Sequence, residues 1–131
     1  MKKIAIISDI HGNLEALKTV LNDIKEKNID EIICLGDIVA KGTHPNECID
    51  LIRKHCHVVL KGNTDRFISE ETDKSNTNDL THKRWKWNRD LVTKENLLYL
   101  KSLPFSYEFY LEDQLVRMFH ATPTKDDCIV S

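Results

Sequence analysis

Several features that would place a chain outside the ordinary globular proteins are scarce in this sequence. Its 131 residues include only four glycines and three prolines, which argues against a disordered or low-complexity chain. The apolar run near the N-terminus, Ile4 to Ile7, is much shorter than the roughly 7–15 residues of a secretory signal core. No apolar run approaches the roughly 18 residues of a membrane helix, so we expect no signal peptide and no contact with a membrane.

Closely spaced cysteine pairs are also missing. The four cysteines, Cys34, Cys48, Cys56 and Cys128, include no pair with the two-residue spacing typical of metal or redox motifs. Cys34 lies in an apolar, strand-like run, where a reduced thiol buried in the core is the simplest interpretation. We therefore predict a cytoplasmic protein without disulfides.

The chain carries no large excess of charge of either sign. Lys and Arg number 19 against 21 Asp and Glu, for a formal net charge of −2. Such a balance argues against a polybasic protein that binds nucleic acid or a membrane surface through its net charge. A nuclease stays open as an alternative, because its basic groups can be local.

The apolar residues, 40% of the chain, suffice for one core, so we predict a single domain over residues 1–131. Buried strands are indicated by short, continuous apolar runs at 3–8, 31–35 and 58–60. Helical patterns separate these runs: an apolar stripe follows Asn13, and Pro45 suits the first turn of a second helix. This β-α-β-α-β order predicts an α/β fold with a mostly parallel sheet covered by helices.

The second half of the chain has a different pattern. Residues 69–79 contain no apolar side chain, which predicts a polar loop or lid within the domain. Helical patterns resume near Leu80, and a further helix is expected between Thr93, a suitable N-cap, and Pro104. The last segment alternates like the two strands of a hairpin, at 105–111 and 115–119.

Polar side chains directly follow the predicted strands. Asp9 and His11 follow the first strand, Asp37 the second, Asn63 the third and His120 the last. Because ligands bind at the carboxyl ends of strands in parallel α/β sheets, we expect these side chains to converge at one edge. Their mixed oxygen and nitrogen donors suit a divalent ion such as Mn, Fe, Zn or Ni rather than calcium. The carboxylates of Asp9 and Asp37 should repel each other at this distance. We therefore expect the pKa of one of them to be raised unless cations lie between them.

Several stretches together resemble the calcineurin-like metallophosphoesterase superfamily, and more closely its bacterial phosphodiesterase-like branch. The resemblance rests on DIHGNLEAL, LGDIVAKGTHPNECIDLI, the GN of KGNTD, FHATP, and the segment WNRDLVTKENLLYLKSLP. It covers nearly the whole chain and implies a sandwich of two β-sheets flanked by helices, with a dinuclear metal site at one end. It also implies hydrolysis of phosphate mono- or diesters by a hydroxide that bridges two divalent ions, with Mn as the first expectation.

The resemblance assigns roles residue by residue. It implies that Asp9 and His11 hold the first ion, that Asp37 bridges both ions, and that Asn63 and His120 hold the second. The same resemblance places two further residues beside these ligands. Asn13 would bind the substrate phosphate at a helix N-terminus, and Asp65 would support the ligands from behind. The expected substrate is a small phosphoester.

One departure from the family pattern concerns the proton donor. The family commonly has a histidine after the GN pair, and this histidine protonates the leaving group. Thr64 occupies that position here and cannot act as a general acid near neutral pH. Either a metal-bound water or another group does that work, or the leaving group needs no help. His82 is a candidate substitute that we do not favour.

A second departure concerns the end of the chain. The family has a Gly-His-x-His motif downstream of the segment that resembles FHATP, with one ligand for each ion, and this chain reaches Ser131 without it. We therefore expect a domain truncated at the C-terminus, with an incomplete second sheet that leaves apolar residues around 105–111 uncovered. Such a surface favours a homodimer. The alternative to an active phosphoesterase is then an inactive remnant that binds metal weakly or needs a partner.

A basic and aromatic stretch, KRWKW, keeps the nuclease alternative in view. We favour a solvated helix face for its charged residues and do not favour nucleic-acid contact. Trp85 and Trp87 diverge at this spacing on a helix, so one of them should pack on the core and the other should be partly exposed.

Overall fold

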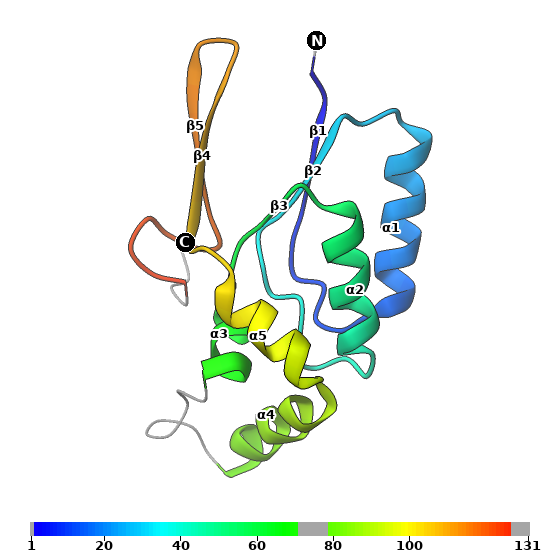
Figure 1. Cartoon of the computed structure of the whole chain (residues 1–131), viewed down its shortest axis with the longest axis vertical. Coiled ribbons are helices and arrows are strands. Elements are labelled where there is room, and N and C mark those ends of the chain that lie inside the picture. Colours follow the sequence, from blue (N-terminus) through cyan, green and yellow to red (C-terminus); the bar gives the residue numbers. More distant parts are fainter. Residues whose placement is uncertain (1, 71–78, 127–131) are drawn as a thin grey trace.

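The computed structural model describes residues 2–70 and 79–126, and within them it has five helices and two small sheets (Figure 1). The helices are α1 (Leu14–Glu26), α2 (Pro45–His55), α3 (Asn63–Glu70), α4 (Asp79–Leu91) and α5 (Lys94–Ser102). The strands are β1 (Ile4–Ile7), β2 (Glu31–Cys34), β3 (Val58–Val59), β4 (Ser106–Leu111) and β5 (Gln114–Phe119). The α/β fold expected from the sequence is confirmed.

The first sheet is parallel and has the order β1-β2-β3. Ile7 pairs with Cys34, and Cys34 pairs in turn with Val59, so the carboxyl ends of all three strands lie at one edge. The predicted β-α-β-α-β order is therefore correct. Each of these strands ends in a loop that carries one of the polar groups singled out in the sequence, which places those groups together.

The helix starts agree with the expected capping residues. The side chain of Asn13 accepts a hydrogen bond from the N–H of Ala16 at 3.1 Å. Thr93 caps α5 in the same way by accepting from the N–H of Asn96 at 3.3 Å. Both bonds satisfy backbone donors that the first turn of a helix leaves unpaired.

Apolar side chains pack on both faces of the parallel sheet. Leu17 of α1 and Ile52 of α2 belong to the larger core, which covers one face. On the other face, Met118 of β5 packs with Ile33 and Leu60 in a smaller core. Figure 1 shows α1 and α2 on one side of β1–β3 and the β4–β5 hairpin on the other. The two sheets therefore face each other across the smaller core.

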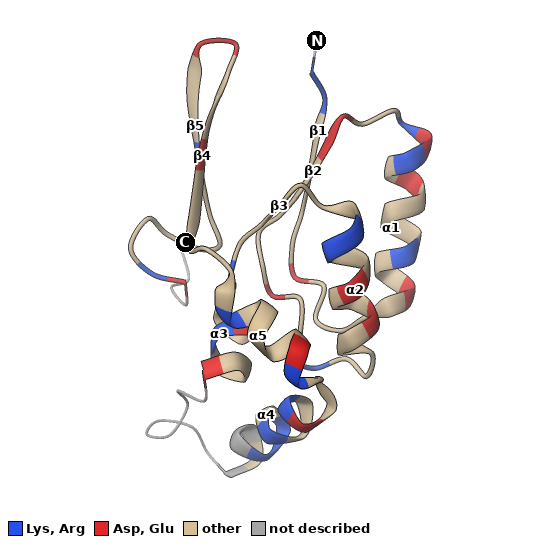
Figure 2. Ribbon diagram, in the orientation of Figure 1, with Lys and Arg blue, Asp and Glu red and all other residues tan. Residues whose placement is uncertain are grey.

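The β4–β5 hairpin is covered on one face only. Its turn residues Glu112 and Asp113 have φ of 49° and 67°, the left-handed pair that a tight two-residue hairpin turn requires. Both are acidic and colour the tip of the hairpin red in Figure 2. Tyr110 and Leu115, which pair across the two strands, are 74% and 50% exposed.

One helix was not predicted. Residues 69–79 were expected to form a polar loop, but Ser69 and Glu70 belong to α3 and Asp79 belongs to α4. Residues 71–78 lie outside the described part of the chain. The short α3 is amphipathic but has only eight residues, and it buries one large aliphatic side chain, Ile68, together with the polar groups of Thr64 and Asp65. Its stability comes from tertiary contacts that periodicity does not reveal.

Among residues 2–70 and 79–126, no helix combines the length and the apolar character needed to cross a membrane. The thiols of Cys34, Cys48 and Cys56 are free, as expected, whereas Cys128 lies outside the described residues.

Candidate metal centre

Two loops at the carboxyl edge of the sheet run side by side and are joined through their backbones. The first follows β1 and the second follows β2. The backbone hydrogen bonds that connect them include those from the N–H of Asp9 to the carbonyl of Gly36 (3.0 Å), from His11 to Asp37 (2.9 Å) and from Gly12 to Ile38 (2.8 Å). These bonds fix the two loops relative to each other and therefore fix the side chains that they carry.

Three candidate ligands have an uncommon backbone conformation. The φ angles of Asp9, His11 and Asp37 are 59°, 50° and 58°, in the left-handed region that non-glycine residues seldom adopt. Such conformations persist where the surrounding structure determines them, and they concentrate at functional sites. Here the hydrogen bonds between the loops hold them.

Two glycines allow the loop after β2 to approach the loop after β3. A Cβ on Gly36 would lie 2.3 Å from the backbone nitrogen of Gly62, and φ of Gly36 is +106°. A Cβ on Gly62 would lie 2.2 Å from Oδ1 of Asp37. The glycines before Asp37 and Asn63 are therefore required by contact between two backbones, which brings both polar residues to the same place.

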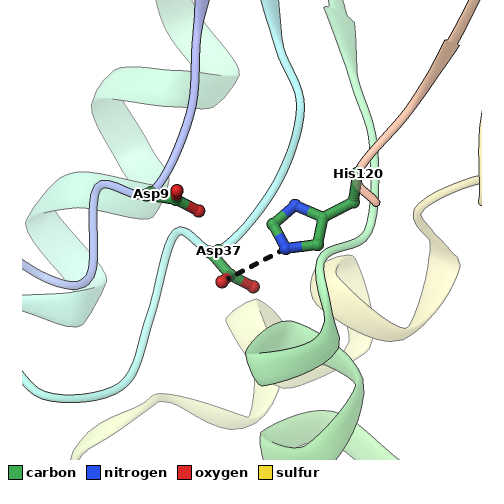
Figure 3. A group of neighbouring side chains, drawn as sticks. All are labelled: Asp9, Asp37 and His120. Carbon is green, nitrogen blue, oxygen red and sulfur yellow. Dashed lines mark ion pairs between the residues drawn. The ribbon is translucent and has the colours of Figure 1, made fainter. Parts of the chain in front are cut away.

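Asp9, Asp37 and His120 form a compact cluster that could hold a metal ion (Figure 3). One potential ligand atom from each lies within 4.8 Å of the others. The three residues come from loops after β1 and β2 and from the end of β5, so the chain brings both sheets to this point. Asp9 is exposed and Asp37 is buried, which leaves one side of the cluster open to solvent.

The two predicted histidine ligands are oriented alike. Nδ1 of His11 lies 3.2 Å from the carbonyl oxygen of Val39, and Nδ1 of His120 lies 2.9 Å from that of Leu35. Both carbonyls can only accept, so each Nδ1 carries the proton. Nε2 then faces Oδ2 of Asp37, at 3.6 Å for His11 and 3.3 Å for His120. A backbone acceptor on one ring nitrogen is the usual arrangement of a metal-ligating histidine.

Asn63, the first residue of α3, completes the group. Its side-chain amide lies directly against Asp37, and with the amide nitrogen on that side it donates to Oδ1 at 3.1 Å and to Oδ2 at 3.2 Å. Asn63 has helical backbone conformation and is not among the residues with positive φ. His11 and Asn63 thus approach Asp37 from outside the compact group of Asp9, Asp37 and His120, so the five expected ligands lie in or beside this cluster.

Thr64 contacts Asp37 rather than a leaving group. Its N–H donates to Oδ1 of Asp37 at 3.1 Å, and its hydroxyl lies 2.9 Å from the same oxygen and 3.1 Å from the carbonyl of Val39. The single hydroxyl proton can serve only one of these acceptors at a time. Thr64 therefore positions Asp37. The sequence did not suggest this role, because it showed only that Thr64 replaces the histidine common in the family.

Asp65 lies behind the cluster and accepts four backbone hydrogen bonds, although no part of it is exposed. The donors are the N–H groups of Asp37 (2.8 Å), Ile38 (2.9 Å), Val39 (3.3 Å) and Gly62 (2.9 Å). Burial raises the pKa of Asp65 to about 7, and the backbone donors oppose that rise. This one carboxylate ties the loop after β2 to the start of α3.

Replacing Asp65 by asparagine should destabilise the protein strongly. The amide offers one oxygen in place of two, so two of the buried N–H donors lose their acceptor. Each unsatisfied buried group costs roughly 1–3 kcal/mol, and we expect the free energy of unfolding to fall by about 3 kcal/mol. Urea denaturation followed by circular dichroism measures the change. Asp50→Asn, on the exposed face of α2, is the matched control, and equal stability of the two variants would contradict this role.

The pKa of Asp37 differs from the expectation that repulsion between the carboxylates of Asp9 and Asp37 would raise the pKa of one of them. Burial on its own would raise the pKa of Asp37, but the hydrogen bond and positive charge of His120, together with the Thr64 donors, lower it overall. The hydrogen bond with Asp37 in turn raises the pKa of His120 to about 9. The expectation was wrong for Asp37 because it omitted the cationic imidazole beside the carboxylate.

Asn13 and His82, the remaining candidates, have different outcomes. Asn13 lines an open groove beside Asp9 and His11, with a volume of about 660 Å³, and its side-chain oxygen caps α1. Its contact with a phosphate stays a prediction. The side chain of His82 lies outside the described part of α4, so its proposed role as an acid is likewise untested.

An α/β fold that gathers carboxylates and imidazoles at the carboxyl ends of parallel strands defines a class of metal-site proteins. Within that class, the sequence profile of the calcineurin-like phosphoesterases matches residues 2–126. The chain belongs to this family.

Relatives and solved structures agree with that membership. The chain is 42% identical over 120 residues to an uncharacterized protein of Methanocaldococcus jannaschii, covering 92% of this chain and 49% of the relative. A metallophosphoesterase from Sphaerobacter thermophilus is 36% identical with a TM-score of 0.68, covering 81% of this chain and 43% of that one. A hypothetical protein from Pyrococcus horikoshii shares the fold, with a TM-score of 0.78, 22% identity, and coverage of 96% and 57%. The chain thus spans about half the length of the relatives it matches.

Proposed function

We propose that this chain is the metal-binding part of a phosphoesterase that hydrolyses small phosphate mono- or diesters with two divalent ions. The observation that carries the proposal is the orientation of His11 and His120. Each ring has its Nδ1 on a backbone carbonyl and its Nε2 toward the same oxygen of Asp37. Four donor groups of mixed oxygen and nitrogen type surround this carboxylate, and that set suits a transition metal.

The proposal assigns the ligands as the sequence suggested. Asp9 and His11 would hold one ion, Asn63 and His120 the other, and Asp37 both. The Asn63 amide would then present its oxygen to the ion in place of its nitrogen to Asp37, a rotation that changes no backbone contact. When bound, the ions supply positive charge toward the phosphoryl oxygens and make water a stronger nucleophile. Manganese is the first ion to test.

The chain's own residues prepare the site for a phosphate. Thr64 and the loop hydrogen bonds hold Asp37 in one orientation before any substrate arrives. The groove beside Asp9 is also lined by Lys41 and by Asn13 at the start of α1. An exposed ammonium group and a helix N-terminus both favour an anion, so the phosphoester is proposed to enter from this groove.

A hydrolysis assay tests the proposed function. The chain is freed of metal with a chelator and assayed with bis-p-nitrophenyl phosphate and p-nitrophenyl phosphate, each with and without added Mn²⁺. We expect release of nitrophenolate only with the ion present, and the ratio of the two rates distinguishes a diesterase from a monoesterase. Equal release with and without added ions, or no release with any of Mn²⁺, Fe²⁺, Zn²⁺ and Ni²⁺, would contradict the proposal.

A cytoplasmic location and a homodimer stay predictions of the sequence. The exposed Tyr110 and Leu115 support the second of these, since uncovered apolar side chains favour association.

A further inference from the structure

A second pocket adjoins the metal centre on the side of α4. It has a volume of about 440 Å³, within the range of small-molecule sites. Asn63 and Thr64, which contact Asp37, are among its lining residues, so the pocket lies beside the cluster around Asp37. Ala40 and Lys41 of the loop after β2 also line it, together with Arg84, Trp85, Trp87 and Asn88 of α4. We call it the Trp87 pocket.

Specific contacts hold α4 against this pocket. The ring of Trp85 stacks on that of Phe67 in α3 at a centroid distance of 4.7 Å. Arg89 donates to the carbonyls of Ile68 (2.9 Å) and Phe67 (3.0 Å). As expected, one tryptophan packs on the core and the other is partly exposed. The side chains that α4 contributes to the pocket are therefore held in place by its contacts with α3.

The chemistry of the Trp87 pocket indicates what it binds. Arg84 and Trp87 are three residues apart and share one face of the helix. Trp87 is 50% exposed, a large aromatic surface that a planar ring can stack on. Neither Arg84 nor Lys41 forms an ion pair with any residue in 2–70 or 79–126, and none of the side chains that line the pocket is acidic. Figure 2 shows α4 rich in basic residues.

We propose that the Trp87 pocket binds the organic group of the phosphoester and selects an aromatic group that carries a negative charge. Trp87 would stack on the ring, while Arg84 and Lys41 would pair with the charge. The pocket's volume suits a single nucleotide-sized group rather than a strand of nucleic acid. This inference rests on the proposed function for the identity of the ester, but binding in the pocket needs no metal.

Calorimetric titration of the metal-free chain with AMP tests the proposal, with adenosine and ribose 5-phosphate as partial ligands. We expect AMP to bind more tightly than either, because each partial ligand lacks one of the two recognised features. Base stacking and a charge-assisted contact are each worth about tenfold in affinity, so Trp87→Leu and Arg84→Gln should each weaken AMP binding about tenfold. Trp87→Phe, which keeps a ring, should retain most of the affinity.

Lys86→Gln is the matched control. Lys86 lies on the same helix but pairs with Asp90 at 3.0 Å and does not line the pocket, so its loss should leave AMP binding unchanged. The inference is overturned if AMP shows no binding, if ribose 5-phosphate binds as tightly as AMP, or if Trp87→Leu behaves like Lys86→Gln. AMP binding that depends on Trp87 without metal-dependent hydrolysis would overturn the proposed function and keep this inference. Metal-dependent hydrolysis without AMP binding that depends on Trp87 would overturn this inference and keep the proposed function.

Discussion

Asp37→Asn should abolish metal-dependent hydrolysis. In the proposed site Asp37 is the only side chain that contacts both ions, and its negative charge offsets their mutual repulsion. Loss of a group that merely orients a ligand costs about 10–100-fold in metal affinity or activity, so loss of the shared ligand should cost more than a hundredfold. The measurement is the rate of bis-p-nitrophenyl phosphate hydrolysis at saturating Mn²⁺, alongside calorimetric titration with the ion.

Asp50→Asn provides the comparison for this variant, because it makes the same chemical change on an exposed face of α2. It should retain the full rate. Asparagine at position 37 can still accept from Thr64 with its one oxygen, so the fold should survive, which circular dichroism verifies. If the activity of Asp37→Asn lies within threefold of that of the control, Asp37 is not a metal ligand and the proposed site is wrong.

Metal affinity should rise steeply with pH between 6.5 and 8.5. The hydrogen bond with Asp37 raises the pKa of His120 to about 9, so the imidazole is protonated at neutral pH in the metal-free chain. An ion binds the neutral ring and must displace that proton. Each unit of pH below this pKa should therefore change the affinity about tenfold, and about one proton should be released per binding event. Titrations with Mn²⁺ in two buffers of different ionisation enthalpy count the protons.

The raised pKa of His120 also predicts that the stability of the metal-free chain falls as the pH rises, whereas its metal affinity increases. A histidine whose folded pKa is raised from 6.5 stabilises the protein fully below that value, and the contribution is lost as the pH rises through about 9. His120→Asn should flatten both dependences, whereas His55→Asn, on an exposed position of α2, should change neither. If metal affinity and stability depend on pH in the His120 variant as they do in the unchanged chain, the proton released on metal binding comes from another group.

The parallel core of the fold and its capping residues were predictable because their signals are local. Buried strands appear as short apolar runs, and the caps at Asn13 and Thr93 precede the helices that they start. Convergence of Asp9, Asp37 and Asn63 was predictable for a related reason. A parallel sheet brings the ends of its strands to one edge, whatever the distance between them along the chain.

Other features depend on partners far away in the sequence. Nothing near His120 indicates that its ring donates to the carbonyl of Leu35, 85 residues earlier, or that it pairs with Asp37 and lowers the pKa of that carboxyl. Likewise, α3 is a helix because Asp65 and Ile68 are buried by other elements. Its sequence, NTDRFISE, is amphipathic, but eight residues with two adjacent apolar side chains, Phe67 and Ile68, are too short to show a repeating helical pattern.

The distance along the chain between the proposed ligands also sets the order of events during folding. Asp9 and His120 are 120 − 9 = 111 residues apart, and the latter reaches the cluster only after β5 has packed against the parallel sheet. An ion would therefore find the five proposed ligands together only in the folded chain. Ion binding confined to that state would shift the folding equilibrium by mass action, so the supply of metal would also govern how much of the chain is folded.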